Sequence, residues 1–253
     1  MKDISIWKET FKITHYFVNP DGLASIQGLA YCLQETAVNH ATAGKFGYEE
    51  LIKNNQAWVL TRQMIKLHRI PRISDKIIVE SWVHQSAETL SFRDFHILDV
   101  QGNILGLART SWMMIDLKAR KPVRIPADLR KNFPHFPGRI REDLPLEKIP
   151  LIRKKRDDLI PFRVVYNDLD MNHHVNNIQY LKWVLDDFSY DFRMKFVLES
   201  IESNYLSEAL FNDSLIRITE NDPVDKNVFI TNIVNNKNDR TLLTSRTKWK
   251  LGK

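Results

Sequence analysis

Cysteine is nearly absent from the sequence. Its 253 residues include one cysteine, Cys32, so no disulfide can form within the chain and no zinc site can be built from cysteine ligands. Such a composition is typical of a reducing compartment. The sequence therefore argues against a disulfide-stabilised secreted domain and against a zinc finger.

Long hydrophobic runs are also missing. A membrane-spanning helix needs about 20 consecutive apolar residues, and no stretch of the chain approaches that length. The first residues, MKDISIWKETF, contain no apolar signal-peptide core and have no transit-peptide character. The composition, 43% hydrophobic and 27% charged, is that of a globular protein. We therefore expect a cytoplasmic protein without membrane insertion.

Positive charge is concentrated in one region. The net charge is +6, and residues 118–158 hold 13 Lys and Arg against 6 Asp and Glu, together with six of the ten prolines. Proline interrupts helices and central strands. We interpret residues 121–157 as a basic linker between domains at 1–120 and 158–253. Its charge either maintains solubility or binds an acidic partner; nucleic acid is not expected, because no nucleic-acid-binding motif accompanies it.

The two flanking regions repeat one order of predicted elements. Apolar residues at helical spacing predict helices within 24–47, with Gly44 and Gly47 as stop signals, and within 176–192. Each helix is preceded by a strand and followed by runs rich in β-branched and aromatic residues. The expected strands are 57–70, 75–85, 89–100 and 104–117, then 197–210, 213–222, 227–236 and 240–250. The helices begin about 150 residues apart, so we predict a tandem α+β repeat in which a sheet wraps one helix.

A polar stretch, DLDMNHHVNNIQYLKW, occupies residues 168–183. Asp170, Asn172 and His174 alternate, which favours an extended segment before the helix. A helix N-terminus attracts oxygen anions, but Asn and Asp are also preferred N-caps. The residues alone leave open whether the stretch only caps the helix or forms a site. The adjacent histidines are a weak metal signal, and we predict no metal site.

This stretch closely resembles the motif D-L-D-x-N-x-H-V-N-N-x-x-Y-x-x-W of the acyl-acyl carrier protein (acyl-ACP) thioesterase family and matches every fixed position. NYLSEAL, with Tyr205 and Glu208, resembles a second family motif. LQETAVNHA, WVLTR and RTSWMMID resemble its first half. The resemblance covers about residues 11 to 210. It implies a tandem hotdog fold and a cofactor-free hydrolysis of acyl-ACP that releases free fatty acid and ends chain elongation.

The resemblance also implies the site residues. We expect Glu208 to act as general base on water, with Asn172 and His174 holding the water or the carbonyl. Asp170 is expected to orient Asn172, and His174 is an alternative base. The expected oxyanion donors are the N–H groups of Val175, Asn176 and Asn177 at the helix start.

One position departs from the family pattern. Plant members have a cysteine directly after the glutamate, whereas this chain has Ala209, so no thiol can act there. A thioester does not need one, because its leaving thiol ionises near pH 8.5. We expect Cys32 to be buried in the core or along an acyl pocket.

The first half has no counterpart of the polar stretch, since NPDGLASIQ lacks histidine. By resemblance it forms the acyl tunnel, with Ile26, Ala30 and Leu33 as candidate lining residues, although each could equally fill the core. The expected partner is acidic acyl carrier protein, attracted by the basic linker. An acyl-CoA thioesterase and a non-catalytic acyl-binding module are alternatives, and both a monomer and a homodimer are compatible with the sequence.

Overall fold

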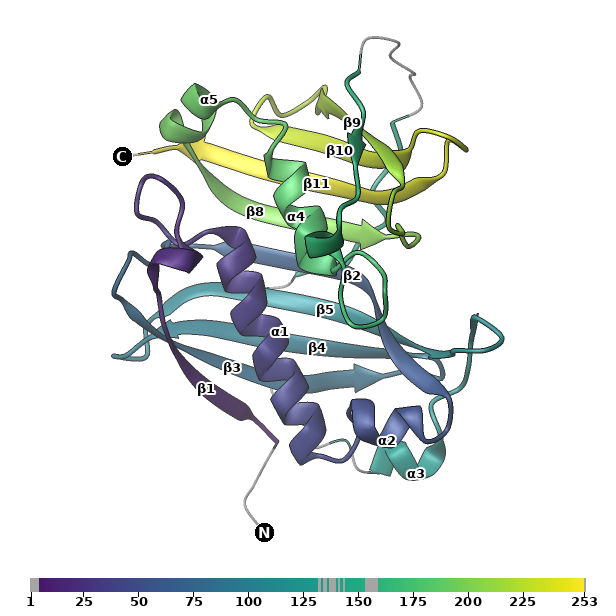
Figure 1. Cartoon of the computed structure of the whole chain (residues 1–253). Helices are drawn as coiled ribbons and strands as arrows, with labels where there is room; N and C mark the ends of the chain where they lie inside the picture. Colours follow the sequence, from purple (N-terminus) through teal and green to yellow (C-terminus); the bar gives the residue numbers. More distant parts are fainter. Residues whose placement is uncertain are drawn as a thin grey trace. The chain divides into compact units, whose positions relative to one another are not determined.

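The computed structural model describes residues 5–252 except 132, 134–135, 137–139, 141, 143 and 153–158. The chain divides into two compact units, Met1–Leu146 and Glu147–Lys253. Each contains an antiparallel sheet and a helix that packs on it (Figure 1).

In the described residues of the first unit, the sheet has five main strands, and a two-residue strand, Lys121–Pro122, pairs with one of them. Neighbouring strands are all antiparallel, and Gly102 supplies a positive φ of 85° in the turn between the fourth and fifth strands of the chain. The predicted strands and this hairpin are confirmed. In sheet order the strands are β1 (Trp7–Lys12), β3 (Lys76–Ser86), β4 (Leu90–Asp99), β5 (Ile104–Asp116) and β2 (Gln56–Leu67).

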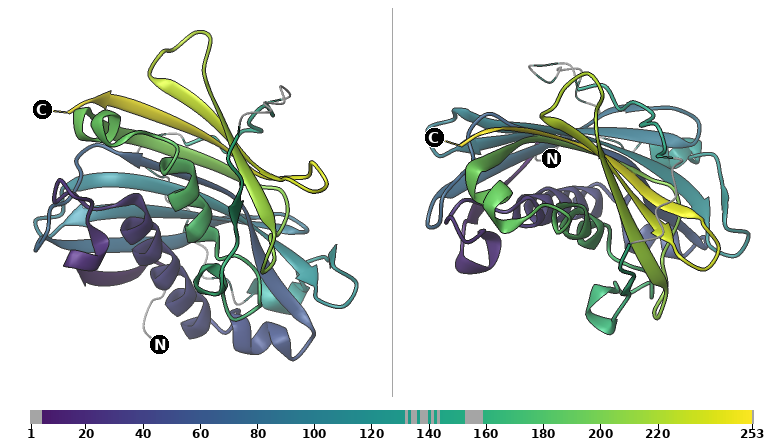
Figure 2. Two further views of the ribbon diagram at one scale, coloured as in Figure 1. Left: turned by 45° about the horizontal axis from the view of Figure 1, so that its top comes forward. Right: turned by 90° about the horizontal axis from the view of Figure 1, so that it is seen from above.

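Helix α1 (Ile26–Ala43) lies along one face of this sheet, which curves over it (Figure 2). It is preceded by the short 3-10 helix η1 (His15–Phe17) and followed by α2 (Tyr48–Ile52). The Ser25 hydroxyl accepts a hydrogen bond from the Gly28 N–H and caps α1. The helix ends at Gly44 as predicted, although Lys45 rather than the glycine adopts the positive φ, 56°.

The basic stretch between the two units also forms secondary structure and packs against the sheet. Its described part contains β6 (Lys121–Pro122), α3 (Ala127–Lys131) and buried apolar side chains. Ile140 and Leu144 pack with Trp82 and Leu107 of the sheet. The Arg109 guanidinium donates to the Leu144 carbonyl at 3.1 Å. Apolar residues spaced along the stretch therefore cover a sheet face. Arg139, Arg141 and the four cations at 153–156 lie outside the described residues.

The second unit repeats the plan. Helix α4 (Asn177–Leu185) buries most of its apolar side chains, and α5 (Tyr190–Lys195) follows. The strands, again antiparallel, are in sheet order β8 (Phe196–Tyr205), β11 (Thr241–Leu251), β10 (Val228–Asn235), β9 (Ser214–Asn221) and β7 (Phe162–Arg163). The 3-10 helix η2 (Tyr166–Asp168) precedes α4.

The predicted helix over 176–192 is in fact two helices. Asp186 and Asp187 follow the last residue of α4, where carboxylates oppose the helix dipole. The Ser189 hydroxyl then accepts the Phe192 N–H at 3.2 Å and starts α5. The predicted strand 197–210 is also too long, because β8 ends at Tyr205.

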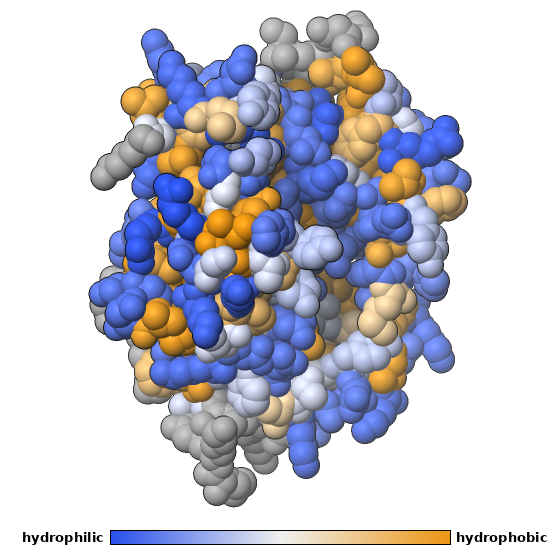
Figure 3. All heavy atoms as spheres, turned by 60° about the vertical axis from the view of Figure 1, so that its left-hand side comes forward, coloured by the Kyte–Doolittle hydropathy of each residue, from blue (hydrophilic) through white to orange (hydrophobic). Residues whose placement is uncertain are grey.

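The two units have the same architecture, one helix against an antiparallel sheet, which confirms the tandem hotdog prediction. Helices α1 and α4 begin at residues 26 and 177, an offset of 177 − 26 = 151. Hydrophobic and hydrophilic side chains are interspersed on the face shown in Figure 3. Within the described part of the chain, no helix is both long and apolar enough to cross a membrane.

Candidate active site

The polar stretch forms a closed turn in the second unit. The Asp170 N–H donates to the His174 carbonyl at 2.8 Å, and the His173 N–H donates to the Asp170 carbonyl at 3.0 Å. His173 adopts a positive φ of 63°, which bends the chain back. Residues 170 to 174 are a loop rather than a helix, as predicted, but the loop is closed and not extended.

Asp170 stabilises this loop with its side chain. Its Oδ1 accepts the Asn172 N–H at 2.8 Å. Asn172 and His173 are exposed, whereas Asp170 and His174 are half-buried. Asp170 therefore orients the backbone at Asn172, and the Asn172 side chain lies where a ligand and water can reach it.

Glu208 approaches this loop from a segment 34 residues further on. Beyond β8, the N–H groups of Leu206 and Ser207 both donate to the Leu242 carbonyl, at 2.8 and 3.1 Å. This shared acceptor ends the regular ladder of hydrogen bonds. The next residues form an isolated antiparallel bridge, His174 to Leu210, so Glu208 lies beside the loop.

His174 and Glu208 come together at this crossing. The His174 Nε2 is 3.5 Å from the Glu208 Oε2, and the two side chains are 25% and 36% exposed. An imidazole and a carboxylate at this distance are close enough for both to bind one water molecule, which they can hold against a substrate. The partial exposure lets water reach the pair.

Two of the three expected oxyanion donors are already used. The Val175 N–H donates to the Ala209 carbonyl at 3.1 Å, and the Asn176 N–H donates to the Asp168 carbonyl at 2.9 Å. Asn176 also caps α4, because its Oδ1 accepts the Ile178 N–H. Of this set, the Asn177 N–H at the first position of α4 remains as a candidate donor.

Buried side chains support the loop from behind. Asp168 is buried, and its carboxylate accepts the Val165 N–H at 2.8 Å and the Gln179 side-chain amide at 2.7 Å. The Tyr180 hydroxyl accepts the Ala209 N–H at 3.0 Å. From the sequence, Tyr180 matches a fixed position of the family motif and widens the apolar face of the helix, and no role is predicted for Gln179. Tyr180 is a fixed position of the family motif and Gln179 is not, but the partners of these two side chains lie 29 and 11 residues away in the chain, so neither contact could be predicted from the sequence.

The first unit contains the same loop but not the histidine and glutamate side chains. The Asn19 N–H donates to the Leu23 carbonyl, the Gly22 N–H donates to the Asn19 carbonyl, and Gly22 has a positive φ of 75°. These contacts repeat those of Asp170, His174 and His173 at the offset of 151 residues. At the positions of Asp170, Asn172, His174 and Glu208, this unit has Asn19, Asp21, Leu23 and Ile70. It therefore lacks the imidazole–carboxylate pair.

Cys32 does not belong to a catalytic centre. It is fully buried in α1, and burial raises the pKa of its thiol to about 12. A thiol with this pKa stays protonated near neutral pH and is a poor nucleophile. Ile26, Ala30 and Leu33 are buried on the same helix.

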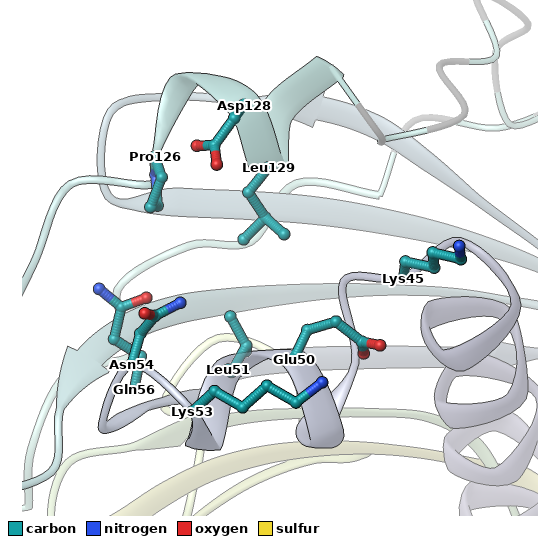
Figure 4. A pocket seen from close by; sticks show the side chains of 9 residues that line it. All are labelled: Lys45, Glu50, Leu51, Lys53, Asn54, Gln56, Pro126, Asp128 and Leu129. Carbon is teal, nitrogen blue, oxygen red and sulfur yellow. The ribbon is translucent and has the colours of Figure 1, made fainter.

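No group of three His, Cys, Asp or Glu side chains that could hold a metal occurs among the residues that the structure describes. A cavity of about 250 Å³ lies between α2 and α3 of the first unit, where Leu51 and Leu129 point toward each other (Figure 4). No histidine lines it, so it offers no imidazole–carboxylate pair. Its other lining residues are Lys45, Glu50, Lys53, Asn54, Gln56, Pro126 and Asp128.

The fold and this site define a tandem hotdog protein with one acid–base pair beside a helix N-terminus. Residues 5–133 match the family model of the acyl-ACP thioesterase N-terminal domain, and residues 152–251 match that of the C-terminal domain. The chain therefore belongs to the acyl-ACP thioesterase family.

Curated relatives include plant enzymes. The chain is 32% identical over 199 residues to a chloroplastic palmitoyl-acyl carrier protein thioesterase of Cuphea hookeriana. It is 35% identical over 198 residues to the chloroplastic acyl-[acyl-carrier-protein] hydrolase FATB2 of Cuphea viscosissima. Each alignment covers 74% of this chain and 48% of the relative, so the chain spans about half the length of these proteins.

Solved structures of similar proteins match along the whole chain. An acyl-ACP thioesterase of Bacteroides thetaiotaomicron superposes with a TM-score of 0.85 at 27% identity, covering 97% of this chain and 98% of that one. The 12:0-ACP thioesterase of Umbellularia californica gives 0.84 at 25% identity, covering 98% of both chains. These matches agree with the tandem hotdog architecture.

Proposed function

We propose that the protein hydrolyses the thioester of acyl-ACP, releasing free fatty acid and ending chain elongation in fatty acid biosynthesis. The observation that carries this proposal is the contact between His174 and Glu208 beside the start of α4, in a chain of the acyl-ACP thioesterase family. Water is the nucleophile, because Ala209 occupies the position of the plant cysteine and Cys32 is buried.

Glu208 is the general base in this proposal. Its carboxylate takes a proton from a water molecule while the water oxygen attacks the thioester carbon. His174 holds Glu208 and the water in line. In the alternative assignment, His174 is the base and Glu208 holds it in position through the same contact. The Glu208 and His174 variants distinguish the two assignments.

The oxyanion forms when the carbonyl π bond breaks. The Asn177 N–H at the positive end of α4 and the Asn172 side-chain amide are the proposed donors. Asp170 contributes by fixing the Asn172 backbone. The tetrahedral intermediate then collapses, the carbon–sulfur bond breaks, and the proton held at the pair returns to the leaving thiolate of the phosphopantetheine arm.

The first unit contributes the acyl tunnel in this proposal. It has no histidine or glutamate at the positions of His174 and Glu208, and Ile26, Ala30 and Leu33 are apolar residues along α1. We propose a cytoplasmic protein that acts as a monomer or a homodimer. The proposed chemistry uses water and the side chains of the loop, with no nucleic acid partner and no cofactor.

Acyl carrier protein is the proposed carrier, docked electrostatically by the basic stretch 118–158. Turnover of acyl-ACP should then fall as salt rises, while turnover of acyl-CoA changes little. The alternative of an acyl-CoA thioesterase rests on the same site, because both carriers present a phosphopantetheine thioester.

The test measures free fatty acid released from acyl-ACPs of several chain lengths beside the matching acyl-CoAs. Glu208→Gln and His174→Ala are expected to lose at least about 100-fold in kcat, consistent with loss of general-base catalysis. Glu199→Gln, a partly exposed carboxylate on β8, is the matched control and should retain wild-type turnover.

The relative kcat losses of the two variants and the preferred carrier decide between the alternatives. A larger loss in Glu208→Gln than in His174→Ala assigns the base to Glu208, and the reverse order assigns it to His174. Preference for acyl-CoA would transfer the function to the alternative. No hydrolysis of either carrier would leave a non-catalytic acyl-binding module.

A further inference from the structure

Ala209 is held by hydrogen bonds on both sides of its backbone. Its N–H donates to the Tyr180 hydroxyl at 3.0 Å, and its carbonyl accepts the Val175 N–H at 3.1 Å. The first bond ties the residue to α4, and the second ties it to the polar loop. Ala209 therefore joins the helix to the loop at the point where the two catalytic side chains meet.

The catalytic residues are the direct neighbours of these bonded groups. Glu208 precedes Ala209, and His174 precedes Val175. Residues 206–210 lie outside a regular strand. The start of this segment is held by the N–H groups of Leu206 and Ser207, which both donate to the Leu242 carbonyl. A shift of the Ala209 backbone would thus move the Glu208 carboxylate relative to the imidazole.

The Tyr180 ring is fixed and its hydroxyl is shielded. The side chain is 3% exposed, and it packs edge-to-face on Trp183 and Tyr205, with ring centroids 5.2 and 6.0 Å away. Burial raises the pKa of the Tyr180 hydroxyl well above its usual range, so the group stays protonated. It is placed to hold a backbone amide rather than to exchange protons with a substrate.

The first unit supplies an internal comparison. It has the same crossing, in which the Ala24 N–H donates to the Pro71 carbonyl at 2.7 Å, as the Val175 N–H donates to Ala209. Pro71 has no N–H to donate. At the offset of 151 residues, Tyr180 corresponds to Leu29, which has no hydroxyl. Donor and acceptor are thus both absent from the unit that has Leu23 and Ile70 at the positions of His174 and Glu208.

The loop forms in the first unit without a tyrosine–amide bond. The first unit forms its loop, its left-handed turn and its crossing without the tyrosine–amide bond. The bond is therefore not needed to build the loop. It occurs where an imidazole and a carboxylate must be kept 3.5 Å apart.

We propose that Tyr180 is a positioning residue, whose hydroxyl holds Glu208 against His174 through the Ala209 amide. The kinetic part of this proposal rests on the proposed thioesterase activity. Tyr180 does not touch the reacting atoms; it acts on the geometry of the pair, to which catalysis is steeply sensitive.

The experiment begins with Tyr180→Phe, which keeps the ring and removes the hydroxyl. The kcat for acyl-ACP should fall about 10- to 100-fold, with KM within about twofold of the wild type, because a displaced base affects the chemical step more than binding. The matched control is Thr231→Val, which removes a fully buried hydroxyl of the same unit, 2.8 Å from Thr219. It should keep wild-type kcat.

Ala209→Pro removes the other half of the bond, and Pro71 shows that this backbone accommodates proline. It should lower kcat as Tyr180→Phe does, and the double variant should lose no more than either single variant. Additive losses in the double variant, or wild-type kcat in Tyr180→Phe, would overturn the positioning role.

A second measurement does not depend on activity. The imidazole resonances of His174, assigned by comparison with His174→Ala, should shift in Tyr180→Phe toward their positions in Glu208→Gln. Unchanged resonances would contradict the proposal. If the wild type hydrolyses no acyl thioester, the proposed function fails, and these resonances alone decide whether Tyr180 positions the pair.

Discussion

Removal of the Asp168 carboxylate should destabilise the second unit. Asp168→Ala leaves two donors without their acceptor, the Val165 N–H and the Gln179 side-chain amide. A hydrogen bond to a charged group contributes about 1.5–3 kcal/mol, so two of them set an upper limit of about 6 kcal/mol. Val165 is 50% exposed, and water can replace part of the loss there. We expect the free energy of unfolding to fall by about 2–4 kcal/mol.

The assay is urea unfolding at fixed pH, followed by circular dichroism. Gln179→Ala removes one of the two donors and leaves the Val165 bond intact, so it should lose less than Asp168→Ala. The midpoint should move while the slope stays constant, because the folded state remains compact. A loss below about 0.5 kcal/mol for Asp168→Ala, the range of ordinary surface substitutions, would refute the reasoning.

Three further predictions follow from individual positions. His173→Gly should keep turnover within about twofold and keep or raise the unfolding free energy by up to about 1 kcal/mol, because Gly22 adopts the same positive φ; a tenfold loss of turnover would place His173 in the site. Burial raises the pKa of Cys32 to about 12, so the unfolded chain releases the proton first above about pH 9 and stability falls as pH rises. Cys32→Ala should have a shallower decline in urea midpoints between pH 9 and 11, and an equal slope would contradict this. Ala30→Phe should shorten the preferred acyl chain in the acyl-ACP panel if Ala30 lines the tunnel, whereas an unchanged profile would assign it to the core alone.

The sequence was sufficient for most of the fold because the signals are local. The helical spacing of Ile26, Ala30 and Leu33 and the β-branched runs of the strands place α1 and the sheets within a few residues. Prediction of the helices from the sequence was wrong where two local signals competed. The apolar pattern continues through Phe188, yet Asp186 and Ser189 end one helix and begin the next.

The site was harder to predict because its contacts join distant residues. His174 and Glu208 are 34 residues apart in the chain (208 − 174) and meet only through an isolated bridge. Their pairing was expected from the family motif and not from periodicity. The positive φ of His173 could not be foreseen either, because residues other than glycine seldom adopt it, and this residue bends an apparently extended loop back on itself.

The two copies of the loop show what the backbone contributes and what it does not. The backbone hydrogen bonds that close the loop and join it to a second segment occur in both copies, as does the left-handed residue. The fold thus positions these side chains in both units, but it does not decide whether they react. Leu23→His and Ile70→Glu would introduce an imidazole and a carboxylate into the first unit. The new carboxylate would not be held in position, because Pro71 has no N–H and Leu29 has no hydroxyl to form the supporting hydrogen bond. The chemistry of the second unit depends on the side chains of its loop together with the tyrosine–amide bond behind them.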